Sequence, residues 1–249
     1  ILNGYSHTYN KKKIHKHETK YTKFLFMDTN CDTNDSYIEQ LVDKNYLNKL
    51  YENFFKLIIK FNNLHLTIKR KKNDKIKILE KHNYLFNKAL KTNRLILISD
   101  SIGMPVSHVS ANADYLFALT TEDIPSALIE CLNKNNRGVI IDYTNLNNIE
   151  EKIYNFGKNN IIFNDIDTLF LKIEKCLTEN RFDDNFGNWS RILDDFKHFD
   201  DYNGSKRVSE YIYELISNIN KGNNTQNSIY KTNKKFIQRY GPTYIATLK

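Results

Sequence analysis

The stretch that decides the fold is YLFALTTEDIPSALIECLNKNNRGVIID, residues 115–142. It opens with an apolar run of strand type at 115–119, passes through a polar turn into a helical pattern that starts near Pro125, and closes with a second apolar run at 138–141. Proline suits the first turn of a helix, and strand, helix and strand in this succession form a parallel crossover unit. We therefore predict one parallel β–α–β unit here.

The same alternation continues on both sides of this unit. Short runs rich in β-branched and aromatic residues predict further strands at residues 23–27, 64–68, 95–98 and 160–163. Longer periodic patterns predict helices near residues 36–61, 74–90, 106–113, 146–156 and 167–178, followed by helices at 189–193 and 205–220. Six strands alternating with helices are typical of a doubly wound, Rossmann-like parallel α/β sheet, here with C-terminal helices.

Composition sets the broad class and the domain limits. With 249 residues, 40% of them hydrophobic, the chain can bury a core, and it has no apolar run near the roughly 20 residues that span a bilayer. We expect a basic leader or interdomain segment at 1–20, a Rossmann-like domain at 21–221 and a polar tail at 222–249. Three widely spaced cysteines predict neither a disulfide framework nor a zinc site and favour the cytoplasm.

The charge balance is basic, with 37 Lys and Arg against 29 Asp and Glu, a net charge of +8. The lysines are spread along the chain among many Asn, Ile and Tyr residues, as an AT-rich genome would produce. We therefore expect no nucleic-acid partner. A basic nucleic-acid binder stays as a third hypothesis that rests on the net charge alone.

Candidate site residues follow the strands at their carboxyl ends, the edge at which open parallel sheets bind ligands. Lysines that follow the strand at 64–68 supply cations, and the helix that starts after Pro125 supplies free backbone N–H groups. Together these groups suit a phosphate. The predicted phosphate-binding residues are Lys69, Lys71, Ser126 and Thr121, and the predicted nucleoside- or sugar-binding residues are Ser99, Asp100, Glu130 and Asp142.

Taken singly, these residues have plainer explanations as helix caps or solvated side chains, and their joint occurrence at one edge favours a ligand. Asp142 and Glu130 could accept hydrogen bonds from ribose hydroxyls. The G-x-G-x-x-G pattern of NAD and FAD sites is absent, and no His, Asp and Glu group has metal-ligand spacing. The sequence therefore predicts no cofactor and no metal, and it identifies no catalytic residue.

Several short sequence segments also match motifs of a known protein family, and they occur in the same order along the chain. Residues 113–119, 124–130 and 137–143 read ADYLFAL, IPSALIE and RGVIIDY, while 67–72 read TIKRKK, 187–190 read GNWS and 199–208 read FDDYNGSKRV. They resemble the A-D-x-x-x-G-x-G-x-x-I-P-S-A-L-I-E-A, G-R-G-V-x-x-D-Y-x-N, I-K-P-K-K, G-D-W-S and F-R-D-G-x-A-S-x-R-I patterns of bacterial surface-carbohydrate glycosyltransferases, which make capsule or lipopolysaccharide. These enzymes have the GT-B architecture of two Rossmann domains. The chain departs from them at Arg70, Thr120, Thr121, Asn188 and Tyr202.

The resemblance implies that residues 21–221 are the C-terminal, nucleotide-sugar (donor) half of such an enzyme. Lys69 and Lys71 would then face the donor phosphates together with Ser126 and its neighbouring amides, and Glu130 would contact the ribose or anchor its helix. Asp201 and Arg207 would close the donor site. A base that activates the acceptor would come from an N-terminal Rossmann domain, which we expect to be missing from this chain.

The function implied is metal-independent transfer of a sugar from a nucleotide-sugar to a surface polysaccharide or lipid-linked acceptor. The expected location is cytoplasmic, with peripheral association at the inner face of the cell membrane left open. Activity would depend on the N-terminal domain. The alternative hypothesis is a noncatalytic module that binds a nucleotide or a partner protein and has lost turnover.

Overall fold

A computed structural model describes residues 21–28, 44–70, 83–98, 106–120, 125–132, 137–143, 151–192 and 203–241. These residues fall into two compact units, an α/β unit that runs to Ile192 and a helical unit that lies beyond Leu193. The boundary between the two units, after Ile192, therefore differs from the domain limit at residue 221 that the sequence predicts.

The α/β unit is built on one parallel sheet of six strands in the order β3-β2-β1-β4-β5-β6. Neighbouring strands pair in parallel throughout, for example Asp28 with Arg70 and Thr120 with Asp142. This is the doubly wound, Rossmann-like arrangement, so the predicted fold class is confirmed. The strands are β1 (Thr22–Asp28), β2 (Leu64–Arg70), β3 (Leu95–Ile98), β4 (Tyr115–Thr120), β5 (Arg137–Asp142) and β6 (Ile162–Phe163).

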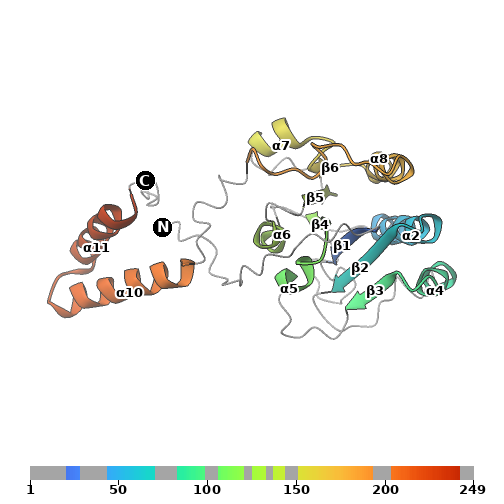
Figure 1. Ribbon diagram of the computed structural model, residues 1–249. Helices are drawn as coiled ribbons and strands as arrows, with labels where there is room; N and C mark the ends of the chain where they lie inside the picture. The colour runs from blue at the N-terminus through green and yellow to red at the C-terminus, as the bar shows by residue number, and fades with distance from the viewer. Residues whose placement is uncertain are drawn as a thin grey trace. The chain divides into compact units, whose positions relative to one another are not determined.

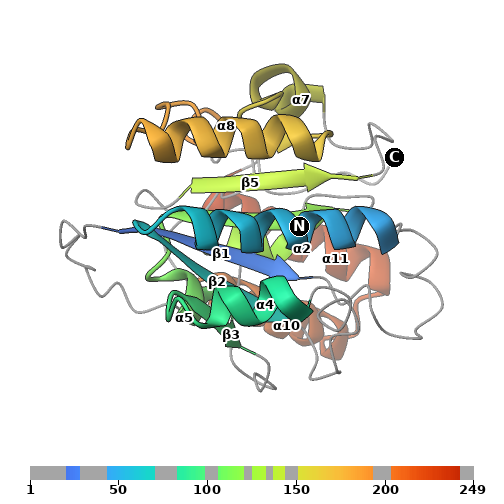
Figure 2. The same ribbon diagram turned by 90° about the vertical axis from the view of Figure 1, so that its right-hand side faces the viewer.

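Helices cover both faces of the sheet (Figure 1). Helices α2, α4 and α8 lie together on one face, which is turned to the viewer in Figure 2, while α5 and α6 pack against each other on the opposite face. Helix α7 packs beside β6 at the edge. Their bounds are α2 (Lys44–Lys60), α4 (Asn83–Leu90), α5 (Val106–Ser110), α6 (Ser126–Cys131), α7 (Glu151–Gly157) and α8 (Ile166–Thr178).

An aromatic cluster forms the centre of the core between the sheet and α2. Phe54 of α2 is fully buried, and its ring centroid lies 5.0 Å from that of Phe26 in β1, 5.6 Å from that of Phe117 in β4 and 5.0 Å from that of Phe170 in α8. Alternate residues of a strand point to one face. The apolar runs recognised in the sequence therefore pack on α2 and α8 through every second side chain.

The amino end of β5 is closed by the segment after α8. Gly138 donates its N–H to the carbonyl of Gly187 at 2.9 Å and accepts from Trp189 Nε1 at 2.8 Å. The sequence predicts a short helix at 189–193, and the structure has a turn at residues 190–192 instead. Buried Trp189 is fixed by its hydrogen bond to the strand.

Replacing Gly138 by alanine is expected to destabilise the α/β unit by about 1–3 kcal/mol. The added Cβ would lie 2.7 Å from Leu132 Cδ2 and 2.9 Å from Trp189 Nε1, so the indole must move and weaken its hydrogen bond. Denaturation followed by tryptophan emission measures this. Unchanged stability together with unchanged emission would contradict the close packing described.

The helical unit is a hairpin of α10 (Gly204–Asn220) and α11 (Thr225–Tyr240). The sequence predicts a polar tail from residue 222, but 16 of those residues form α11. Asn224 caps the helix, accepting from Asn227 N at 2.8 Å, and the face buried against α10 contains Ser228, Thr232 and Phe236. Two of these three buried side chains are small and polar, which is why hydropathy did not indicate a helix.

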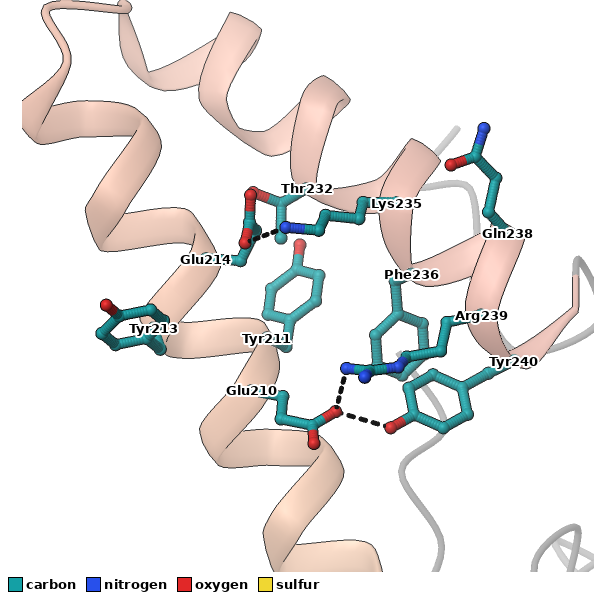
Figure 3. A pocket seen from close by; sticks show the side chains of 10 residues that line it. All are labelled: Glu210, Tyr211, Tyr213, Glu214, Thr232, Lys235, Phe236, Gln238, Arg239 and Tyr240. Carbon is teal, nitrogen blue, oxygen red and sulfur yellow. Dashed lines mark hydrogen bonds and ion pairs between the residues drawn. The ribbon is translucent and has the colours of Figure 1, made fainter.

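Ion pairs join the two helices of the hairpin (Figure 3). Glu210 accepts from Arg239 at 2.8 Å and from the Tyr240 hydroxyl at 2.6 Å, and Glu214 pairs with Lys235 at 2.6 Å. These side chains line an open pocket of about 470 Å³. Residues 203–241 carry seven basic and two acidic side chains, so this hairpin holds +5 of the chain's net charge of +8. The basic charge is thus less evenly spread than the sequence suggested.

Candidate nucleotide site at the carboxyl edge

The strand order reverses between β1 and β4. Chain connections run outward from these two central strands in opposite directions, and doubly wound proteins bind ligands beyond the carboxyl ends of the strands at such a reversal. The structure describes side chains at the ends of β1, β2 and β5 at this edge. The candidate site is built from them.

A buried ion pair joins the ends of β1 and β2. Arg70 Nε lies 3.0 Å from Asp28 Oδ2, and the Tyr51 hydroxyl of α2 donates to the same oxygen at 2.7 Å. The side chains of Arg70 and Asp28 are only 2% and 5% exposed. Because Asp28 and Arg70 are register partners and both point toward α2, strand alternation itself brings the charges together. The pair fixes the ends of β1 and β2 at the carboxyl edge.

Lys69 lies on the opposite face of the sheet from Arg70, because successive strand residues alternate. It is only 6% exposed, and its Nζ donates to the carbonyl of Arg70 at 3.3 Å, a long hydrogen bond. Burial lowers the pKa of Lys69 below its usual value, and the Cys131 thiol acts in the opposite sense. Lys69 is thus a buried cation on the α6 side of the sheet, within electrostatic range of Cys131 at the last residue of that helix.

Asp142 ends β5 and is also buried, with 2% exposure. Its Oδ2 accepts a hydrogen bond from the Tyr154 hydroxyl of α7 and another from Asn164 Nδ2 at 3.1 Å. Burial, followed by the hydrogen bond to Asp142, raises the pKa of Tyr154 to about 12. The network holds the carboxylate at the strand end, where the sequence predicts contact with a nucleoside or sugar.

Tyr46 stands in the first turn of α2 and meets the end of β5. Its ring makes an edge-on contact with that of Tyr143, with the centroids 4.9 Å apart. The hydroxyl oxygen of Tyr46 is shielded from solvent and has no hydrogen-bond partner in the described part of the chain. Burial raises the pKa of Tyr46, and the carboxylates of Asp142 and Asp165 raise it further.

Three further predicted site residues can be placed at least in part. Ser126 begins α6 directly after Pro125, and its backbone is the part described. Glu130 lies half-buried in the same helix. Arg207 is buried in α10 of the helical unit, with its guanidinium carbon 6.0 Å from the centroid of the Tyr240 ring. Lys71, Ser99, Asp100, Thr121 and Asp201 lie outside the described residues.

Sequence reasoning assigned no role to the Asp28, Arg70 and Tyr51 cluster or to Tyr46. Asp28 and Arg70 end two apolar runs, a position that marks the carboxyl edge. Tyr51 belongs to the buried stripe of α2, so its spacing indicated only core packing. Pairing of the two strand ends becomes visible once the register is known.

The G-N-W-S and R-G-V segments that contributed to the resemblance meet at the other end of the sheet. Gly187 approaches the start of β5 with φ +67°, and a Cβ there would lie 2.9 Å from Arg137 Cβ. Only glycine combines this backbone conformation with so close an approach. These segments hold the amino edge of β5 and are not part of the candidate site.

Within the described ranges, no group of three or more His, Cys, Asp and Glu side chains could hold a metal ion. Nor does any helix among the residues placed by the structure have the length and apolar character needed to cross a membrane.

Comparison with known proteins identifies no family. No family model matches the chain, and no curated protein sequence does. Among solved structures, the chain is similar to a S. aureus MnaA–UDP co-structure, with 10% sequence identity and a TM-score of 0.47. The match covers 84% of this chain and 50% of that one, so the chain spans half the length of the structure it resembles.

Proposed function

We propose that the α/β unit binds the nucleotide part of a nucleotide-sugar at the carboxyl edge of its sheet, beside the reversal between β1 and β4. The observation that carries this proposal is the placement of a buried cation, Lys69, at the end of the strand next to that reversal. A buried ammonium gains most from an anion that replaces its lost hydration. A diphosphate offers that charge, and the sugar and base can extend along the strand ends.

The finer proposal is that this unit is the donor half of a metal-independent glycosyltransferase for a surface polysaccharide or lipid-linked acceptor. It rests on the segments that resemble those enzymes. Lys69 and the α6 start would stabilise the charge that grows on the leaving phosphate as the glycosidic bond breaks. Lys71, Ser126 and Thr121 would assist at the phosphates.

Thermal unfolding with CMP, CDP, UDP and GDP tests the binding proposal. Ligands that bind only the folded state raise the melting temperature, and the shift grows with the logarithm of the ligand concentration relative to its Kd. We expect one nucleoside diphosphate to give a clear shift, larger than that of its monophosphate. No shift with any of the four at millimolar concentration would refute nucleotide binding by this chain.

Replacing Lys69 by methionine is expected to weaken binding of that nucleotide by about 10- to 100-fold, since one charge-assisted hydrogen bond is lost. The unliganded protein should be as stable as the wild type or slightly more so, because a buried charge is removed. The matched control is Lys88→Met, at an exposed position of α4, which should bind normally. Equal affinities of the Lys69 variant and wild type would remove Lys69 from the phosphate site.

A turnover assay distinguishes the enzyme hypothesis from the hypothesis of a noncatalytic binding module. Both hypotheses predict nucleotide binding by the chain. Only the enzyme predicts that this unit, joined to the N-terminal Rossmann domain that the resemblance implies, consumes a nucleotide-sugar and releases the nucleotide when an acceptor is supplied. Tight nucleotide binding without release of product by the longer protein would favour the noncatalytic module.

A further inference from the structure

The Tyr46 hydroxyl is a buried donor with no acceptor among the residues that the structure describes. Its oxygen is shielded from solvent and lacks a hydrogen-bond partner among the described residues, although the ring itself is partly exposed. A buried hydroxyl without a partner destabilises a fold by about the desolvation cost of the group. Phenylalanine would fill the same space without that cost. The hydroxyl therefore calls for an explanation other than packing.

The position of Tyr46 relates this donor to the candidate site. Tyr46 lies in the first turn of α2, on the face of the sheet that also carries Asp28 and Arg70. Its ring contacts Tyr143, the residue that follows Asp142 at the end of β5. The hydroxyl thus stands at the carboxyl edge, where the proposed nucleotide would extend from the phosphates toward β5.

The charges around Tyr46 indicate which part of a nucleotide it would meet. The carboxylates of Asp142 and Asp165 act on it electrostatically, and Asp142 is held in place by Tyr154 and Asn164. Two nearby carboxylates disfavour a phosphate by like-charge repulsion. A ribose hydroxyl suits this environment, since its oxygen can accept a hydrogen bond from a phenol while the hydroxyl donates one to a carboxylate.

We propose that Tyr46 is a specificity-determining residue of the nucleotide site, whose hydroxyl donates a hydrogen bond to a ribose hydroxyl oxygen of the bound nucleotide. The proposal rests on the nucleotide-binding function proposed above and adds a residue and a contact to it. Tyr46 would make the protein distinguish ribonucleotides from deoxyribonucleotides. The stability lost through the unused donor is recovered when the ligand binds.

The test is the variant Tyr46→Phe, which should separate stability from affinity. Without ligand, its melting temperature should exceed that of the wild type by about 2–4 °C, because an unpaired buried hydroxyl is removed. Its affinity for the preferred nucleoside diphosphate should fall about 5- to 10-fold, the worth of one neutral hydrogen bond. A merely structural tyrosine would not give these opposite changes.

The 2′-deoxy and 3′-deoxy forms of the same diphosphate identify the contact. The wild type should bind one of them about 5- to 10-fold more weakly than the ribonucleotide, and this difference should be smaller in Tyr46→Phe, whose side chain cannot donate to the ribose. Tyr154→Phe is the contrasting variant for stability, because it removes a hydroxyl that has an acceptor and should lower the melting temperature. Tyr84→Phe, at a position that is 76% exposed on α4, should change neither property.

The outcomes separate this inference from the proposed function. If the wild type binds no nucleotide, both the proposed function and the Tyr46 contact are refuted. If the wild type binds a nucleotide and Tyr46→Phe binds it equally well, the Tyr46 contact is refuted while nucleotide binding stands. If Tyr46→Phe binds weakly but discriminates against the deoxy forms as strongly as the wild type does, the hydroxyl contacts another part of the nucleotide, and the ribose assignment is overturned.

Discussion

Replacing Arg70 by methionine is expected to lower the free energy of unfolding of the α/β unit by about 3–5 kcal/mol. The substitution leaves the Asp28 carboxylate, which is only 5% exposed, without its cation. The Tyr51 hydroxyl would still donate to Asp28 Oδ2, but a neutral donor does not replace a charge. Chemical denaturation followed by the fluorescence of Trp189, the only tryptophan in the chain, reports on this unit.

A combined variant distinguishes the loss of the pair from the loss of packing. In a Tyr51→Phe background, Asp28→Leu together with Arg70→Met removes both charges and the hydroxyl that donates to Asp28. A buried pair replaced by apolar side chains of similar size is often close to neutral. Most of the lost stability should therefore return relative to Arg70→Met alone. An Arg70→Met protein as stable as the wild type would contradict the buried ion pair.

Replacing Phe54 by alanine is expected to cost about 3–5 kcal/mol as well, through the cavity it creates. Phe54 is fully buried and contacts aromatic rings of β1, β4 and α8, so no single neighbour can fill the space. The rings come from both the sheet and the helices that cover it, which limits collapse into the cavity. The same denaturation experiment measures the change.

Phe156 provides the matched control for this substitution. It lies on α7 and is 56% exposed, so Phe156→Ala should change the free energy of unfolding by no more than about 0.5 kcal/mol. Equal effects of the two substitutions would mean that the Phe54 cluster is not the centre of the core. A cost below about 1 kcal/mol at Phe54 would lead to the same conclusion.

Much of the α/β unit could be predicted because its signals are local. Apolar runs mark the buried strands, and Pro125 marks a helix start close to the observed one at Ser126. The helix at α11 was missed because its buried face contains Ser228 and Thr232, whose burial depends on the partner helix. Asn218 Nδ2 of α10 donates to Thr232 Oγ1 at 3.1 Å, a pairing that no hydropathy pattern contains.

For the candidate site, the sequence predicts only its location at the carboxyl edge of the sheet, and not the contacts between its side chains. Strand ends can be read from the sequence, and they located Lys69 and Asp142 correctly at the carboxyl edge. The face of the sheet on which each side chain lies depends on the alternation of residues along the strand, and its contacts depend on the register between neighbouring strands. Arg70 was therefore noted only as a departure from a pattern, although it forms the buried pair with Asp28.

The sequence by itself determined the order of the six strands and of the helices between them, because hydrophobic periodicity and turn- or cap-forming residues act over a few residues. The spatial order of the strands was decided by tertiary structure, since it places β4 beside β1 across about 90 residues of intervening chain. The tertiary arrangement likewise pairs Asp28 with Arg70, through the register of β1 and β2, and brings Tyr46 to Tyr143. These contacts join residues far apart in sequence, so their energies depend on the folded arrangement and not on local pattern.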